Sequence, residues 1–189
     1  VSVYQKAAFK PHSRGNNEAP IPNRLDRQFD QKRPLEALVT DLTYVRVDRR
    51  WAYVCLTIDF FNREIIGLTV GWHKTAELVK QAIQSIPYAL TKAKLFHSDR
   101  GKEFDNQLID EMLEAFGITR SLSQAGCPYD NAVAESTYRS FKLEFINQET
   151  FQSLKELALK TKDYVHWWNY HRIHGSLNYQ TPMTKRIIA

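Results

Sequence analysis

The sequence has few cysteines and no long apolar run. Cys55 and Cys127 are its only cysteines among 189 residues, and two cysteines so far apart form neither a zinc-ligand pattern nor a disulfide framework. We expect both to be reduced, as in cytosolic proteins. No apolar stretch approaches the ~18 residues of a membrane-spanning helix, and the initial VSVYQKAAFK has no apolar core resembling a signal peptide. The sequence therefore predicts a cytoplasmic protein with no membrane partner. Because it begins with Val rather than Met, we expect it to be part of a longer chain.

The composition is that of a globular protein with a mild basic excess. Hydrophobic residues make up 43% and charged residues 25%, which excludes a wholly disordered or collagen-like chain. The net charge is +5, and residues 1–50 hold ten Lys and Arg against six Asp and Glu. Such an excess is compatible with nucleic-acid binding but is also typical of a solvated surface.

The chain divides at residue 34. Residues 1–34 hold four of the seven prolines and no sustained apolar periodicity, so we expect a largely irregular linker or N-terminal extension. Residues 35–189 are expected to form one catalytic core with a C-terminal helix and tail. Three β-rich segments, 37–47, 51–59 and 64–72, are separated by short turns and predict an antiparallel meander.

The rest of the core alternates between helical and extended patterns. In chain order we expect a helix capped by Thr75, a strand at 93–99, a helix capped by Asp105 with Gly117 as its C′ residue, a strand at 118–122, a helix capped by Asp130 or Asn131 that runs to about Asn147, and a helix that starts near Ser153 with a Ser153–Glu156 capping box. This order matches an α/β ribonuclease H-like fold, with a five-stranded mixed sheet and helices on both faces.

Three acidic residues are candidates for a metal site. Asp41 lies inside the first strand, Asp99 at the end of the fourth, and Glu135 in the first turns of the following helix. Each alone could be exposed or cap a helix. If the first and fourth strands are adjacent, however, the two aspartates meet and the helix can bring Glu135 to them. Converging carboxylates suit Mg²⁺ or Mn²⁺, and two such ions ~3.5–4 Å apart serve phosphodiester chemistry.

Four motifs resemble the catalytic core of a known family. They are 40–44 (TDLTY), 97–101 (HSDRG), 126–135 (GCPYDNAVAE) and 169–174 (NYHRIH), the last followed by Leu177, Thr181 and Pro182. In this order, with thirty-five residues between Asp99 and Glu135, they resemble bacterial insertion-sequence transposases of the OrfB type, relatives of retroviral integrases.

The resemblance implies a DNA transposase domain that nicks element ends and transfers the freed 3′-hydroxyl into target DNA, for integration and recombination. It also implies that Asp41, Asp99 and Glu135 are the catalytic, metal-holding triad, with two Mg²⁺ ions (or Mn²⁺ as substitute) per site. The partners would be the element ends and target DNA, with a homo-oligomer assembled on them. Two alternatives remain open: a ribonuclease H-type nuclease of the same fold, and a catalytically silent DNA-binding or assembly module, which should have lost a triad acid.

Basic residues around the triad are candidates for DNA contact. Lys142 fills the basic position that the family has seven residues after its glutamate, and Arg139 shares its helical face. Both could instead lie on a solvated surface, with Arg139 in a Glu–Arg pair. Arg100 and Lys102, which flank Gly101, are further candidates. Arg172 and His174 could bond to the core or contact DNA.

Other polar residues fit structural roles better. We expect His97 to be a packed, hydrogen-bonded imidazole rather than a general base, and Asp59 to be a turn residue. Glu103 replaces the glutamine usual in the family, and it could disturb local DNA contacts or face solvent. Trp167 and Trp168 follow an apolar stripe, which favours core packing or a partner surface over base stacking.

Overall fold

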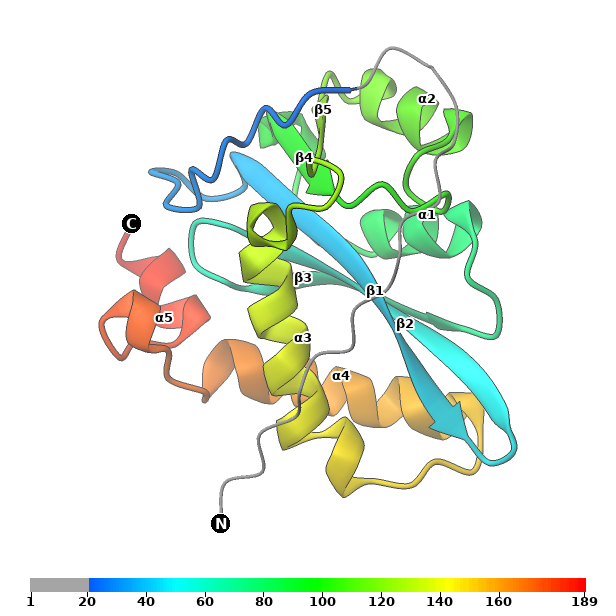
Figure 1. The fold of residues 1–189 in the computed structure, drawn as a ribbon. Coiled ribbons are helices and arrows are strands. Elements are labelled where there is room, and N and C mark those ends of the chain that lie inside the picture. The colour runs from blue at the N-terminus through cyan, green and yellow to red at the C-terminus, as the bar shows by residue number, and fades with distance from the viewer. Residues whose placement is uncertain (1–20) are drawn as a thin grey trace.

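The computed structural model describes residues 21–189, which form a sheet covered by helices on both faces (Figure 1). Its strand order is β3-β2-β1-β4-β5, with bounds β1 (Ala37–Val47), β2 (Arg50–Asp59), β3 (Ile65–Gly71), β4 (Leu95–Ser98) and β5 (Thr119–Leu122). The first three strands pair antiparallel, whereas β4 is parallel to both β1 and β5. The expected five-stranded mixed sheet is confirmed.

Two apolar clusters lie on opposite faces of this sheet. The helices are α1 (Ala76–Gln84), α2 (Gln107–Ala115), α3 (Ala132–Glu144), α4 (Leu154–Tyr170) and α5 (Pro182–Ile187). Helices α1 and α2 cover one face and α3 and α4 the other. None of the helices in the described residues is long and apolar enough to cross a membrane.

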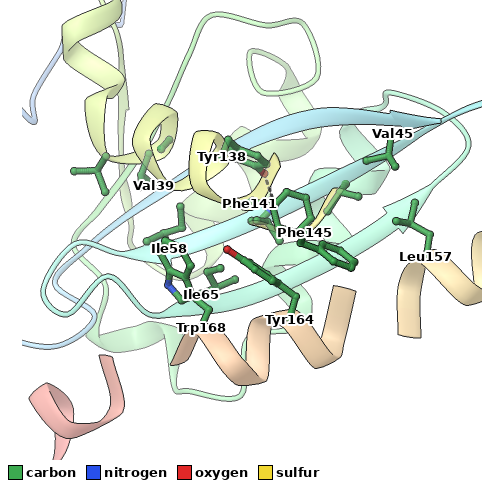
Figure 2. Close-up of a cluster of buried hydrophobic side chains, with 14 of the residues drawn as sticks. Val39, Val45, Ile58, Ile65, Tyr138, Phe141, Phe145, Leu157, Tyr164 and Trp168 are labelled. Atoms are coloured by element: carbon green, nitrogen blue, oxygen red, sulfur yellow. Dashed lines mark hydrogen bonds between the residues drawn. The ribbon is translucent and has the colours of Figure 1, made fainter. Parts of the chain in front are cut away.

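Aromatic side chains fix α3 against α4 (Figure 2). The Phe145 ring stacks on Tyr164 with centroids 5.2 Å apart, and Phe141 meets Tyr164 edge-on at 5.3 Å. Phe141 is fully buried, and Trp168 is nearly so. Such pairs add about 0.5–1.5 kcal/mol each beyond the area they bury. The position of α3 over the sheet is therefore well determined, which matters because α3 carries Glu135.

Most of the expected helix caps are present, including Gly117 as the C′ residue of α2 with a φ of 69°. Thr75 and Ser153 accept the expected capping hydrogen bonds from Leu78 and Glu156 N–H. The expectation that Asp105 caps α2 is wrong.

Asn106 caps α2 instead, and its Oδ1 accepts from Ile109 N–H. The carboxylate of Asp105 is drawn to Arg120, 3.0 Å away. Helix α3 ends at Glu144, earlier than expected, and Asn131 occupies its N-cap without a side-chain hydrogen bond.

The segment before β1 has no helix or strand from residue 21 to residue 36, but part of it packs on the core. Leu25 is almost fully buried, and the N–H groups of Arg24 and Leu25 donate to Ser121 Oγ on β5. The division of the chain at residue 34 stays a prediction, and residues 1–20 lie outside the described part of the chain.

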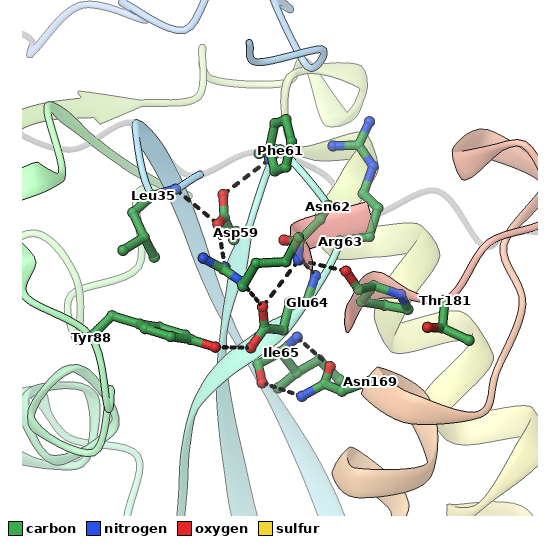
Figure 3. Close-up of polar contacts among 12 residues, drawn as sticks. Leu35, Asp59, Phe61, Asn62, Arg63, Glu64, Ile65, Tyr88, Asn169 and Thr181 are labelled. Carbon is green, nitrogen blue, oxygen red and sulfur yellow. Dashed lines mark hydrogen bonds and ion pairs between the residues drawn. The ribbon is translucent and has the colours of Figure 1, made fainter. Parts of the chain in front are cut away.

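Asp59 is not a simple turn residue, because it belongs to a buried ionic network (Figure 3). Its carboxylate accepts from Leu35 and Phe61 N–H and lies 2.8 Å from Arg186 of α5. The same guanidinium contacts Glu64 at 2.5 Å. Burial raises the pKa of Asp59 despite these partners. The network attaches α5 near the end of the sheet at which β1 and β4 begin, away from Asp99.

Candidate active site

The register of β1 and β4 brings Asp41 and Asp99 together. Val39 pairs with His97 in the parallel ladder, and each aspartate follows its partner residue by two positions. Side chains two residues apart on a strand point to the same face, and Val39 belongs to the cluster covered by α3 and α4. The two carboxylates therefore lie side by side on the α3 face, at the carboxyl end of β4.

Glu135 reaches the same place from the first turn of α3. It is exposed, and a cavity of about 370 Å³ is lined by Asp41, Asp99 and Glu135 together. The loop 123–127 forms the rest of its wall with Arg100 and Asn131. Within residues 21–189, no three His, Cys, Asp or Glu side chains lie close enough to hold one ion. The three acids share a cavity but do not form a closed cage.

The two aspartates carry raised pKa values. Burial is the largest cause for Asp41, and the nearby charges of Asp99 and Glu135 add to it, so its pKa rises from 3.8 to about 7. The Leu42 N–H, which donates to Asp41 Oδ1 at 2.7 Å, opposes the shift only in part. Burial also raises the pKa of Asp99, and Glu103 contributes. The site thus holds negative charge that a cation would stabilise.

This donor set fits a hard divalent cation. Oxygen-only carboxylate ligands suit Mg²⁺ or Mn²⁺, whereas zinc would favour His and Cys. The nearest histidine in sequence, His97, is fully buried and bonded at both nitrogens, to Ser121 Oγ (2.9 Å) and Ser123 Oγ (3.1 Å). Burial lowers its pKa to about 4. As expected, His97 is a packed, hydrogen-bonded imidazole and not a general base.

Lys74 and Glu103 are site neighbours that the sequence did not single out for this role. Lys74 Nζ lies 2.7 Å from Glu103 Oε1, and its charge offsets a small part of the rise in the pKa values of Asp41 and Asp99. Glu103 does not face solvent, because its side chain is only 7% exposed and is paired with Lys74. A Cβ at Gly101 would lie 2.4 Å from Glu103 Oε1, so glycine at position 101 lets this carboxylate pack there.

Tyr138 ties α3 to the strand that carries Asp41. Its buried hydroxyl donates to the Asp41 carbonyl oxygen and accepts from Leu56 N–H at 2.8 Å. Leu56 is the residue opposite Asp41 in the β1–β2 ladder. Since Tyr138 lies one turn after Glu135, this contact sets the helix that bears Glu135 against the backbone of Asp41.

We predict that Tyr138→Phe lowers the free energy of unfolding by about 1–3 kcal/mol, because the buried Leu56 N–H and the part-buried Asp41 carbonyl lose a partner while the ring stays packed. Urea denaturation of both proteins measures this. Tyr53→Phe provides the control, since Tyr53 is only partly buried. Equal stability of Tyr138→Phe and the parent would contradict the inferred role of the hydroxyl.

The basic candidates lie in three different places. Arg139 and Lys142 line a second cavity of about 340 Å³ that also contains Asp41 and Glu135. Arg100 borders the acidic cavity, but its guanidinium donates to the carbonyls of Ser123 and Ile21. Lys102 is exposed nearby.

Arg172 and His174 line neither of these two cavities. Arg172 forms a bidentate pair with Glu144 and lies over the Trp168 ring. His174 is buried with its ring edge-on to Trp168 at 4.5 Å. Both line a smaller pocket beside Ser136 and Ser140, on another side of α3. Their contacts favour bonding to the core.

The fold is that of a ribonuclease H-like domain, an antiparallel meander followed by the parallel strands β4 and β5. The chain belongs to the integrase core domain family. One family model matches residues 31–128, just over half of the chain, and a second integrase core model matches residues 116–182. The two matches together include Asp41, Asp99 and Glu135.

Curated relatives are bacterial insertion-sequence transposases. The transposase for insertion sequence element IS904 of Lactococcus lactis is 28% identical over 188 residues, which cover 96% of this chain and 74% of that protein. Transposase InsF for insertion sequence IS3A of Escherichia coli is 29% identical, covering 90% and 62%. A probable IS1353 transposase of Shigella flexneri is 30% identical, covering 91% and 34%. The resemblance drawn from the motifs is confirmed.

Solved structures with this fold are retroviral integrases. The catalytic core domain of HTLV-2 integrase, determined in complex with magnesium, matches with a TM-score of 0.56 and 15% identity over 82% of this chain and 97% of that one. A chain of a simian T-cell lymphotropic virus intasome matches with a TM-score of 0.68 and 12% identity, covering 90% and 60%. At these identities the comparison establishes the ribonuclease H-like fold alone.

Proposed function

We propose that the chain is the catalytic domain of a DNA transposase, which nicks element ends and joins the freed 3′-hydroxyl to target DNA. The observation that carries the proposal is that Asp41 and Asp99 each lie two residues beyond Val39–His97, the last pair of the parallel β1–β4 ladder, and that Glu135 lines the same cavity. Membership of the integrase core family and the transposase relatives support it.

In this proposal the three acids hold divalent cations. Asp41 and Asp99 would share the ions and Glu135 would complete a second position, with Mg²⁺ as the natural ion and Mn²⁺ as its substitute. Two bound ions would supply activation of the attacking oxygen and stabilisation of the leaving oxygen. The protein contributes the fixed register of β1 and β4, the attachment of α3 through Tyr138, and the charge of Lys74, which offsets part of the acidic cluster.

The DNA backbone would follow the basic side of the cavities. Arg139 and Lys142 would hold phosphates, because they line the cavity that continues from Asp41 and Glu135. We assign Arg100 and Lys102 a weaker role at the rim, and Arg172 and His174 a structural one. Phosphate contacts of this kind position the duplex without reading its sequence.

The chain spans 74%, 34% and 62% of the length of the three relatives named above. Action on element ends and target DNA is therefore part of the proposal. We propose that the whole protein acts on DNA in the bacterial cytoplasm, as a homo-oligomer assembled on the paired ends.

A strand-transfer assay with Mn²⁺ tests the function. We expect joined products from an element end that already carries a recessed 3′-hydroxyl, mixed with target plasmid. A ribonuclease H-type nuclease would instead cut an RNA–DNA hybrid and form no joined product, and a silent binding module would do neither. Either of those results would overturn the proposal.

A further inference from the structure

The acidic cavity is the first of three neighbouring cavities along the edge of β1, which share lining residues and are together called the groove. On this edge β1 pairs with β4 only as far as Val39, and the next bridge in the described residues joins Val47 to Phe151. Between these two points no described strand pairs with that edge. The cavity with Arg139 neighbours a third cavity of about 380 Å³, since Lys142 lines both. Tyr44, Arg46 and Trp51 of the β1–β2 hairpin form one wall of this third cavity. Figure 1 shows this hairpin extending past the other strands.

Aromatic rings and cations alternate at this end of the groove. Tyr44 is 58% exposed and Trp51 is 50% exposed, and their rings meet edge-on with centroids 5.1 Å apart. Lys142 Nζ lies 5.1 Å from the Tyr44 ring, and the Arg46 guanidinium lies 5.3 Å from the Trp51 ring. Exposed rings in such a row cost hydration free energy unless a ligand covers them.

The local charge favours an anionic ligand. Arg46 and the hairpin residues Arg49 and Arg50 are all exposed, and Lys142 lies at the junction of the two cavities. The acid on the wall, Glu149, is already paired with Lys160 Nζ at 2.7 Å. A ligand with both flat rings and negative charge would satisfy the rings and the cations together.

Unpaired nucleotides have this combination, whereas a duplex does not present the faces of its bases. Stacking of bases on aromatic side chains beside a basic track is the general mode of single-strand binding. From these observations we propose that Tyr44 and Trp51, flanked by Lys142 and Arg46, bind unpaired nucleotides of a DNA strand that leads into the carboxylate site. The inference rests on the proposed function and extends it to a single-stranded segment of the substrate.

The test measures binding of an oligothymidylate of about 12 nucleotides, a length within the usual single-strand site sizes, and of a blunt duplex, both in EDTA. Trp51→Ala and Tyr44→Ala should each weaken oligothymidylate binding by about fivefold to a hundredfold, the usual effect of losing one stacked base. Duplex binding should change less than twofold by this argument, because phosphate contacts supply it. Lys142→Ala should weaken both.

Two variants guard against an indirect effect. Trp51→Phe keeps a flat ring and should retain most single-strand affinity. Trp167→Ala removes a similarly exposed tryptophan, 42% exposed on α4 and outside the groove, and should leave that affinity unchanged. Unchanged oligothymidylate affinity in both groove variants would overturn the inference, as would equal losses for single strand and duplex. A change in sedimentation of the DNA-free protein would also overturn it, by indicating a protein interface.

The outcome is separable from that of the proposed function. Binding in EDTA requires no metal and no intact triad. Groove variants that bind like the parent, in a protein that performs strand transfer, refute only the inference. If the groove variants lose single-strand binding but the parent performs no strand transfer, only the transposase proposal is refuted.

Discussion

Glu135→Gln should abolish strand transfer, by about a thousandfold or more, while DNA binding survives. The substitution keeps the size of the side chain but removes one charge from the oxygen donors of the cavity shared with Asp41 and Asp99. In phosphoryl transfer of this kind, the placement of charges supplies most of the rate enhancement. Losing a single preorganised group typically lowers the rate by about 10²–10³-fold. Glu135 is exposed, so folding should be unaffected.

The measurement pairs a Mn²⁺ strand-transfer assay with duplex binding in EDTA. Glu111→Gln serves as control, because Glu111 is an exposed acid of α2 whose side chain, within residues 21–189, is hydrogen-bonded to Gln107 alone. Wild-type strand transfer by Glu135→Gln would falsify the three-acid assignment. Parallel loss of DNA binding would show that Glu135 acts by shaping the surface and not by holding ions.

The fold was predictable because the periodicity of this sequence changes where the structure changes. Residues 37–47 have the pattern of a strand, and β1 has the same bounds. Apolar side chains of β1 pack into the clusters on both faces of the sheet. The Asp99–Glu135 spacing and the motif order also predicted the family. What sequence could identify was local chemistry and order along the chain.

The sequence could not give the contacts made across long separations. Asp59 resembles a turn residue locally, yet it is paired with Arg186, 127 positions away. Asp105 is a good capping residue by type, but Arg120 attracts its carboxylate. The hydroxyl of Tyr138 contacts Asp41 from 97 residues away. Each depends on the tertiary fold, which no local pattern encodes.

The exposed aromatic groove was missed for a related reason. Tyr44 and Trp51 fit the period-two pattern of a hairpin, so they read as ordinary strand residues. Arg46 and Trp51 are direct cross-strand partners, but only α3 brings Lys142 to Tyr44. A signal was present in the row of aromatic and basic residues from 44 to 53, although it does not reveal exposure.

Asp41→Asn should make the metal-free protein more stable, by an amount that grows with pH. In the folded state the pKa of Asp41 is about 7, chiefly because of burial, against an ordinary 3.8. Between these values the folded state holds a proton that the unfolded state has released, so stability falls as pH rises through this window. The gain from Asn should be small at pH 4 and reach at most about 4 kcal/mol at pH 8.

Thermal unfolding in EDTA at several pH values measures this gain, and Asp163→Asn on the exposed side of α4 controls for loss of an ordinary carboxylate. Adding Mg²⁺ should then stabilise the folded parent by mass action, by about 2.7 kcal/mol at a hundredfold excess over the dissociation constant, and so raise its Tm. Asp41→Asn should show little of this effect. The pH effect and the Mg²⁺ effect have one cause. Burial and the charge of Asp99 destabilise the ionised Asp41 carboxylate, and a bound cation would stabilise it. A stability difference independent of pH, or an equal Mg²⁺ response in both proteins, would contradict that cause.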